Sequence, residues 1–245
     1  MCALLLAFSL LAQAAAKPED TAANDALDKF KSDYKAKESS ARASAVLELG
    51  KTQHEKVVAR VGQVLTSPDD KDVRIAAAKA LGGATEYKKK SAQVLIAAIG
   101  PNQKDSVVVA AILEGLGKLG DQVAVGTVES EFKSKDVTVL KAAVEAAEGL
   151  GSRSSVPLLI DLLKRLEDGA KTAPNVGGGG GYGGGKYGGL GGGGGVTDQM
   201  AKDRENVVKP VVNKVLTTLT KASHTTAKEW EDWWRTEGGK YLSGK

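Results

Sequence analysis

Two glycine-rich segments of the sequence look like nucleotide-binding loops. Residues 115–120 read Gly-Leu-Gly-Lys-Leu-Gly, which satisfies the G-x-G-x-x-G pattern of a dinucleotide-binding turn. That pattern requires a strand before it and a helix after it, whereas here it ends a predicted helix. Residues 180–187 nearly satisfy the phosphate-binding pattern G-x-x-x-x-G-K-[ST], but Tyr187 stands where a Ser or Thr would bind Mg²⁺. Neither segment therefore predicts a nucleotide site.

Residue types that bind metals or transfer protons are present but scattered. The two histidines, His54 and His224, are about 170 residues apart, and neither has a second ligand at metal-binding spacing. Asp69, Asp70 and Asp72 precede a predicted helix and lack the glycine and bidentate glutamate of an EF-hand, so we expect them to cap the helix. No G-x-S-x-G nucleophile motif occurs. We therefore expect no catalytic residues, no metal site and no cofactor.

The composition favours helices and excludes a nucleic-acid-binding class. Of 245 residues, 42% are apolar and 26% charged, as in ordinary globular chains. Aromatic residues reach 4%, which suits close helix packing better than strands. The chain has 34 basic and 30 acidic residues, and its net charge of +4 is too small and mixed for nucleic-acid binding. The densest basic run, Lys88-Lys89-Lys90, is typical of a solvated face, so we expect no membrane-surface binding.

Four segments in the middle of the chain align with one another. Each is an alanine-rich apolar stretch that ends in glycine, and the closing glycines are 32, 35 and 34 residues apart. The segments are 41–50, 73–82, 108–117 and 142–151. A second apolar stripe at helical spacing follows each one. Because a fixed period of this length indicates a repeat architecture, each unit predicts a pair of helices, the first ending at a left-handed glycine.

These units resemble HEAT repeats, which are antiparallel helix pairs that stack into a right-handed solenoid. The resemblance covers residues 38–168. It rests on Asp72-Val73-Arg74 opening an alanine-rich helix, on Leu81-Gly82 closing it, and on the run of apolar residues in 156–163. The resemblance implies an all-α fold, an α-solenoid of four to five HEAT-like helix pairs. It also implies a scaffold function, although HEAT units serve in unrelated settings.

The two ends of the repeat array are expected to be covered by capping helices. Residues 17–37 predict an N-terminal capping helix with Phe30 on its apolar face. Residues 199–245 predict a terminal helix pair that closes the exposed end of the solenoid. Its second helix carries Trp230, Trp233 and Trp234 on one face. We favour a buried cap for these tryptophans, and the alternative is an exposed aromatic platform for sugar or peptide. This tryptophan-containing helix also resembles the C-terminal ends of exported bacterial HEAT-repeat proteins.

A glycine-rich segment separates the repeats from the terminal pair. Of the 19 residues in 177–195, 15 are glycine, so the segment cannot form a core. We expect 169–198 to be a disordered insertion, and its Tyr182, Lys186 and Tyr187 are candidate partner contacts.

The first 16 residues have the pattern of a secretory signal peptide. They carry no charge, and an apolar run leads to Ala14-Ala15-Ala16 before Lys17. The basic residue that usually opens such a signal is missing, so either the signal is atypical or the start is misassigned. We expect residues 1–16 to be removed on export to the periplasm or the outside of a bacterial cell. Removal eliminates Cys2, the single cysteine, and with it any disulfide.

Three functions remain open from the sequence. The leading hypothesis is a non-enzymatic exported scaffold that binds an unidentified protein along its stacked second helices. The second is a module that binds carbohydrate or the cell envelope through Trp230, Trp233 and Trp234. The third is an enzyme, because HEAT-like repeats also occur in bilin lyases, but the residues here support the repeat alone.

Overall fold

The computed structural model describes residues 17–172 and 194–243. The expected signal peptide at 1–16 and the candidate contacts Tyr182, Lys186 and Tyr187 lie outside these residues. The described part contains eleven α-helices and no strand. The helices are α1 (Pro18–Asp33), α2 (Ser39–Leu49), α3 (Glu55–Leu65), α4 (Lys71–Gly82), α5 (Lys88–Ile99), α6 (Ser106–Leu119), α7 (Val125–Ser130), α8 (Val137–Leu150), α9 (Val156–Thr172), α10 (Gly194–Thr220) and α11 (Ala227–Ser243).

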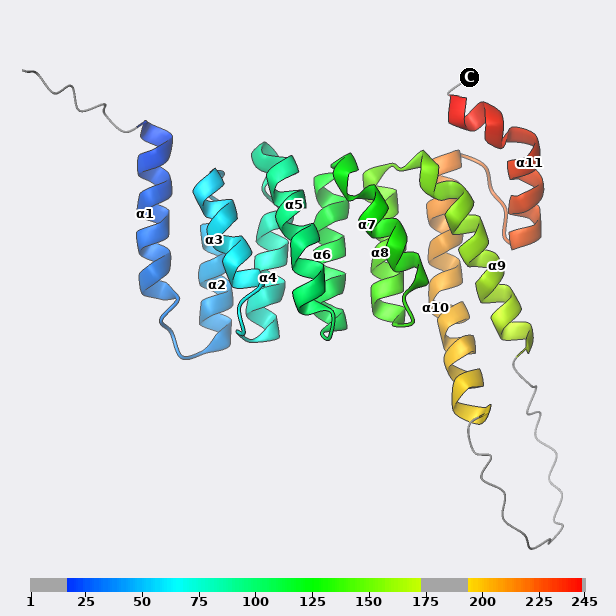
Figure 1. Ribbon diagram of the computed structural model, residues 1–245, viewed down its shortest axis with the longest axis horizontal. Coiled ribbons are helices and arrows are strands. Elements are labelled where there is room, and N and C mark those ends of the chain that lie inside the picture. The colour runs from blue at the N-terminus through cyan, green and yellow to red at the C-terminus, as the bar shows by residue number, and fades with distance from the viewer. Residues whose placement is uncertain (1–16, 173–193, 244–245) are drawn as a thin grey trace, which may run out of the picture.

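Helices α2 to α9 form four antiparallel pairs that stack side by side, and α10 and α11 make the last pair, in which α11 runs in the same direction as α10 (Figure 1). The first helices of the pairs, α2, α4, α6, α8 and α10, pack against one another in one layer, here called the first-helix layer. The second helices, α3, α5, α7, α9 and α11, make the second-helix layer. Helix α1 packs on α2 and α3 at the N-terminal end. This arrangement confirms the predicted all-α solenoid with capping helices at its ends.

The core lies between the two layers and follows the sequence pattern. Alanines of the first helices, such as Ala77 and Ala143, are fully buried and let these helices approach closely. The second helices contribute larger side chains, such as Leu65, Leu95 and Leu159, each 0% exposed. Small residues of the first helices pack against larger side chains of the second helices, so the helix pairs stack into one continuous core.

The role predicted for the closing glycines is wrong at three of four positions. Only Gly151 ends its helix in the left-handed conformation, with φ of +60°. Gly50 follows α2 with φ of −63°, while Gly82 and Gly117 lie inside α4 and α6. Helix α6 continues to Leu119 and ends at Gly120, whose φ is +64°.

Close helix contact explains these three glycines instead. A Cβ atom on Gly82 would lie 2.7 Å from the Cα atom of Gly115 in the next first helix. A Cβ atom on Gly117 would lie 2.8 Å from the Cα atom of Ala146 in α8. On Gly50 it would lie 2.5 Å from the Cβ atom of Ala80. The absence of a side chain therefore lets successive first helices touch along their backbones.

The third helix pair is the weak unit of the second-helix layer. Helix α7 has 6 residues, compared with 12 in α5 and 17 in α9. A 3₁₀ turn at Glu131–Lys133 follows it and places Phe132 in the core, 2% exposed. The sparse apolar stripe of this unit in the sequence corresponds to this shortened helix.

Arginines at equivalent positions of the first two pairs reach the next pair. The sequence predicts an incomplete arginine ladder, since Arg42 matches Arg74 whereas Val109 and Ala143 follow in the next units. In the structure Arg42 Nη2 lies 2.8 Å from Asp69 Oδ1. Arg74 Nη2 lies 2.6 Å from Asp105 Oδ2. The ladder thus ties the first three pairs together.

The ion pair of Asp69 makes the stability of this end depend on pH. Burial alone would raise the pKa of Asp69, but hydrogen bonds from Arg42 and Tyr34 outweigh it and hold the pKa below its ordinary value of 3.8. The pair therefore stabilises the fold above pH 3.8 and loses its effect as the pH falls through the folded-state pKa.

We expect Asp69→Asn to lower the melting temperature at neutral pH, because it removes the carboxylate that Arg42 and Tyr34 bind. The difference from the wild type should shrink as the pH falls below 3.8. Thermal unfolding of both proteins across this range measures it. Asp70→Asn is the matched control, since Asp70 also contacts Arg42 but its side chain is 60% exposed. A loss that stays constant with pH would contradict the assignment.

Candidate functional site

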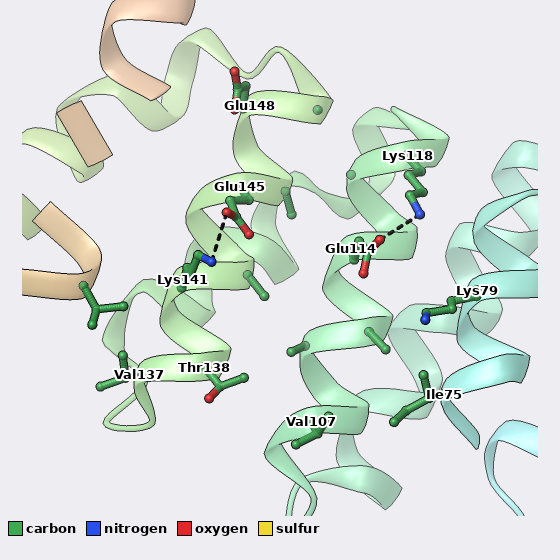
Figure 2. A pocket seen from close by; sticks show the side chains of 17 residues that line it. Ile75, Lys79, Val107, Glu114, Lys118, Val137, Thr138, Lys141, Glu145 and Glu148 are labelled. Atoms are coloured by element: carbon green, nitrogen blue, oxygen red, sulfur yellow. Dashed lines mark ion pairs between the residues drawn. The ribbon is translucent and has the colours of Figure 1, made fainter. Parts of the chain in front are cut away.

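A groove of about 730 Å³ crosses the first-helix layer. Most of its lining comes from α6 and α8 (Figure 2). Helix α4 adds Ile75 and Lys79 on one side, and α10 adds Val207 on the other. The groove thus spans four consecutive first helices.

One end of the groove is apolar. Ile75, Val107 and Val137 gather there together with Thr138 (Figure 2). The side chain of Val107 is 51% exposed, and Val207 is 45% exposed. Such exposure of branched apolar residues in one depression leaves apolar area that another molecule can cover.

The other end of the groove carries charges of both signs. Lys118 Nζ lies 2.7 Å from Glu114 Oε1, and Lys141 Nζ lies 3.7 Å from Glu145 Oε1, each pair within one helix (Figure 2). Lys79 and Glu148 also line this end, and Glu148 contacts Lys214 of α10 at 3.3 Å. The lining thus contains three lysines and three glutamates, so the groove has no excess of either charge.

Small residues create the depth of the groove. Ala111, Ala142 and Ala146 line its wall where larger side chains would fill it. A Cβ atom on Gly149 would lie 2.5 Å from the carbonyl oxygen of Gly117, so α6 and α8 touch backbone to backbone there. Gly117 and Gly149 both line the groove, so this backbone contact lies in its wall.

The second-helix layer, where the sequence analysis placed the partner, presents a more polar face. Lys90 Nζ pairs with Glu55 Oε1 at 2.9 Å, and Lys56 Nζ pairs with Asp20 Oδ1 at 2.7 Å. Lys90 of the basic run and Lys56 are thus each paired with an acidic residue of another helix. Leu158, in α9 of this layer, is a large apolar residue that is 42% exposed.

The three tryptophans lie together on α11, in different degrees of burial. Trp230 is 0% exposed, and its Nε1 donates to Asn213 Oδ1 at 2.9 Å. Trp233 and Trp234 are half-buried and pack against the core. Their ring centroids are 6.2 Å apart, and that of Tyr241 lies 5.9 Å from Trp233. A surface platform here would therefore consist of Trp233, Trp234 and Tyr241, with Trp230 beneath it.

A capping box fixes the start of α11. The Oγ1 atom of Thr226 accepts a hydrogen bond from Glu229 N at 3.3 Å, and Glu229 Oε2 accepts one from Thr226 N at 3.1 Å. Backbone hydrogen bonds from Thr225 and Thr226 lower the pKa of Glu229. These hydrogen bonds satisfy backbone N–H groups at the start of the helix that carries Trp230.

The remaining sequence motifs have structural roles. Residues 115–120 form the end of α6 and its C-cap. His54 caps α3, its Nδ1 accepting from Lys56 N at 3.1 Å. Within residues 17–172 and 194–243, no group of three or more His, Cys, Asp and Glu side chains could hold a metal ion.

The residues of the groove could not be identified from the sequence. Val107 and Val108 are adjacent and identical in type, yet Val108 is 0% exposed and Val107 is 51% exposed. Helical spacing in the sequence predicts which face of each helix is buried. It does not predict where a groove forms between neighbouring helices. The one signal in the sequence was the concentration of Ala and Gly in 108–117 and 142–151.

Comparison with known proteins supports the repeat. Residues 27–108 match a family model of HEAT repeats. HEAT repeats generally serve as scaffolds for protein interaction. No curated protein matches the sequence significantly. Among the described helices, none is long and apolar enough to cross a membrane.

Proposed function

We propose that this protein is a non-enzymatic, exported HEAT-repeat scaffold that binds another protein in the groove of the first-helix layer. The observation that carries the proposal is the groove itself, with exposed Val107 and Val207 on a continuous solenoid surface. The interaction class comes from the HEAT repeats, which generally bind proteins.

The lining of the groove favours a partner segment with an apolar stripe. Val107, Val137 and Val207 offer apolar area in the groove, and burial of such area supplies about 25 cal/mol per Å². The paired charges at Glu114 and Lys118 would border the segment and set its orientation rather than its affinity. A few buried apolar anchors would therefore supply most of the binding energy.

The charges of the groove support a protein partner over nucleic acid or an anionic membrane. Binding to a polyanion requires a surplus of Lys and Arg that displaces counterions. Here Lys118 and Lys141 are each paired with a glutamate of their own helix. These pairs also support a non-enzymatic role, since none of these groups stands ready as a nucleophile or a base in the groove.

Export rests on the sequence of residues 1–16. The uncharged apolar run and the Ala14-Ala15-Ala16 site support a signal peptide removed before Lys17, with delivery to the periplasm or the extracellular space of a bacterium. N-terminal sequencing of the protein from fractionated cells tests this directly. Recovery of Met1 from the cytosol would contradict it.

We expect Val107→Glu to weaken partner binding about tenfold or more, because it places a charge in the apolar end of the groove. Titration of the purified partner, obtained by cross-linking, measures the change. Val123→Glu is the matched control, since Val123 is 43% exposed and lies outside the groove lining. Equal binding by the two variants would contradict the groove as the site.

The second candidate function, carbohydrate or cell-envelope binding, is supported by the half-buried rings of Trp233, Trp234 and Tyr241. Arg153 lies over the ring of Tyr241, 5.3 Å from its centroid, and adds a polar edge. Binding to peptidoglycan fragments that disappears in Trp234→Ala, while the Val107→Glu variant binds normally, would favour this function over the first.

A further inference from the structure

A second cavity, of about 680 Å³, lies where α9 and α10 meet the start of α8. Its walls are largely apolar, from Val137, Leu162, Leu166 and Ala201. Three cationic side chains also line it: Lys135, Arg165 and Arg204. Asp203 is the one acidic residue in the described lining. The cavity therefore combines an apolar interior with a surplus of positive charge.

The two arginines are held side by side by a single turn of the chain. Arg204 Nη2 donates to the carbonyl oxygen of Ser134 at 2.6 Å. Arg165 Nη2 donates to the carbonyl oxygen of Phe132 at 3.5 Å. Because these carbonyls are two residues apart, two guanidinium groups from different helices converge on one place. Burial and the nearby charge of Arg165 both lower the pKa of Arg204.

One hydrogen-bond donor of this arginine pair has no acceptor. The Nε atom of Arg204 is buried and donates to no group in the part of the chain that the structure describes. A buried donor without a partner destabilises the fold, because it has lost its hydrogen bond to water. Arg165 differs, since its Nε pairs with Asp161 Oδ2 at 3.1 Å. Arg204 thus brings a positively charged guanidinium group to the cavity wall.

We infer that this cavity binds a small organic carboxylate with an apolar body, its carboxylate placed between Arg204 and Arg165. Guanidinium N–H groups of Arg204 and Arg165 would donate to the carboxylate oxygens, and charge-assisted bonds of this kind are roughly twice as strong as neutral ones. The walls formed by Leu162, Leu166 and Ala201 would cover the apolar body.

The charge of the lining favours a single negative charge on the ligand. Asp203 lies in the lining, and Asp161 already neutralises part of Arg165. A dianion or a polyanion would meet these carboxylates, whereas one carboxylate brings the charge of the described lining near neutrality. The apolar walls separate such a ligand from an inorganic anion, which has nothing to place against them.

Calorimetric titration of the full-length protein with octanoate tests the inference, with octanamide and acetate as comparison ligands. We expect octanoate to bind about tenfold or more tightly than octanamide, which lacks the charge, and than acetate, which lacks the apolar body. Arg204→Gln should weaken octanoate binding about tenfold or more, and Ala201→Phe should also weaken it, because the ring would occupy space along the apolar wall. Arg235→Gln, at an arginine whose side chain is 76% exposed on α11, is the matched control and should bind as the wild type does.

Absence of octanoate binding, or equal binding of octanoate and octanamide, would overturn the inference. Normal binding by Ala201→Phe would place the ligand elsewhere and overturn it as well. If Arg204→Gln fails to fold, the comparison of the three ligands on the wild type and on Ala201→Phe still decides the question.

Discussion

Replacing Trp230 with alanine is expected to lower the free energy of unfolding by about 3–5 kcal/mol, as large-to-small changes of buried aromatics do. Trp230 is 0% exposed and seals the last helix pair. The change removes its packing and leaves Asn213 without the hydrogen bond from Trp230 Nε1. Val212, Val215 and Leu216 of α10 belong to the same hydrophobic core. Denaturant unfolding followed by circular dichroism measures the loss.

Trp233→Ala is the matched control on the same helix. Because Trp233 is half-buried, it should lose less stability than Trp230→Ala does. Similar losses for the two variants, or a loss below about 1 kcal/mol for Trp230→Ala, would show that the helix does not act as a cap.

Replacing Gly117 with alanine is expected to cost about 1–3 kcal/mol, because the added methyl group would meet the backbone of α8. The new Cβ atom would lie 2.8 Å from the Cα atom of Ala146 and 3.3 Å from its carbonyl oxygen. The two helices must therefore move apart, and this strains the first-helix layer.

Gly126→Ala makes the same chemical change where there is room for it. Gly126 lies within α7, and nothing lies within 4 Å of a Cβ atom built on it. This variant should gain up to about 1 kcal/mol, because alanine is a better helix former than glycine. Opposite signs for the two variants in denaturant unfolding support close packing at Gly117, and a gain in both would rule it out.

Much of the fold could be predicted from the sequence, because the repeat spacing and the apolar stripes reflect burial that every helix pair shares. The function of the glycines could not be predicted from the sequence. A left-handed helix end and a backbone contact between helices both select against a side chain, so Gly82 and Gly151 look alike in sequence. The structure separates them, since Gly151 has φ of +60° whereas Gly82 lies inside α4 against Gly115.

The candidate site was harder to predict because it depends on relations between helices. Val107 belongs to the groove only because α8 brings Val137 beside it, and nothing in either segment encodes that distance. The convergence of Arg165 and Arg204 likewise requires a turn at Phe132 and Ser134 that supplies both carbonyls. The tryptophan cluster was visible in the sequence, but the different burial of Trp230 and Trp233 depends on the packing of α11 against α9 and α10.

Site-specific photo-cross-linking in the native cell tests the central claim most directly. A photoreactive phenylalanine analogue is placed at Val107, in the first-helix groove, or at Leu158, exposed on the second-helix layer. The proposed function predicts one discrete cross-linked protein from position 107 that is absent from position 158 and lost when Val207→Glu is added. A discrete product from position 158 alone would contradict the groove, and so would products that are the same at both positions.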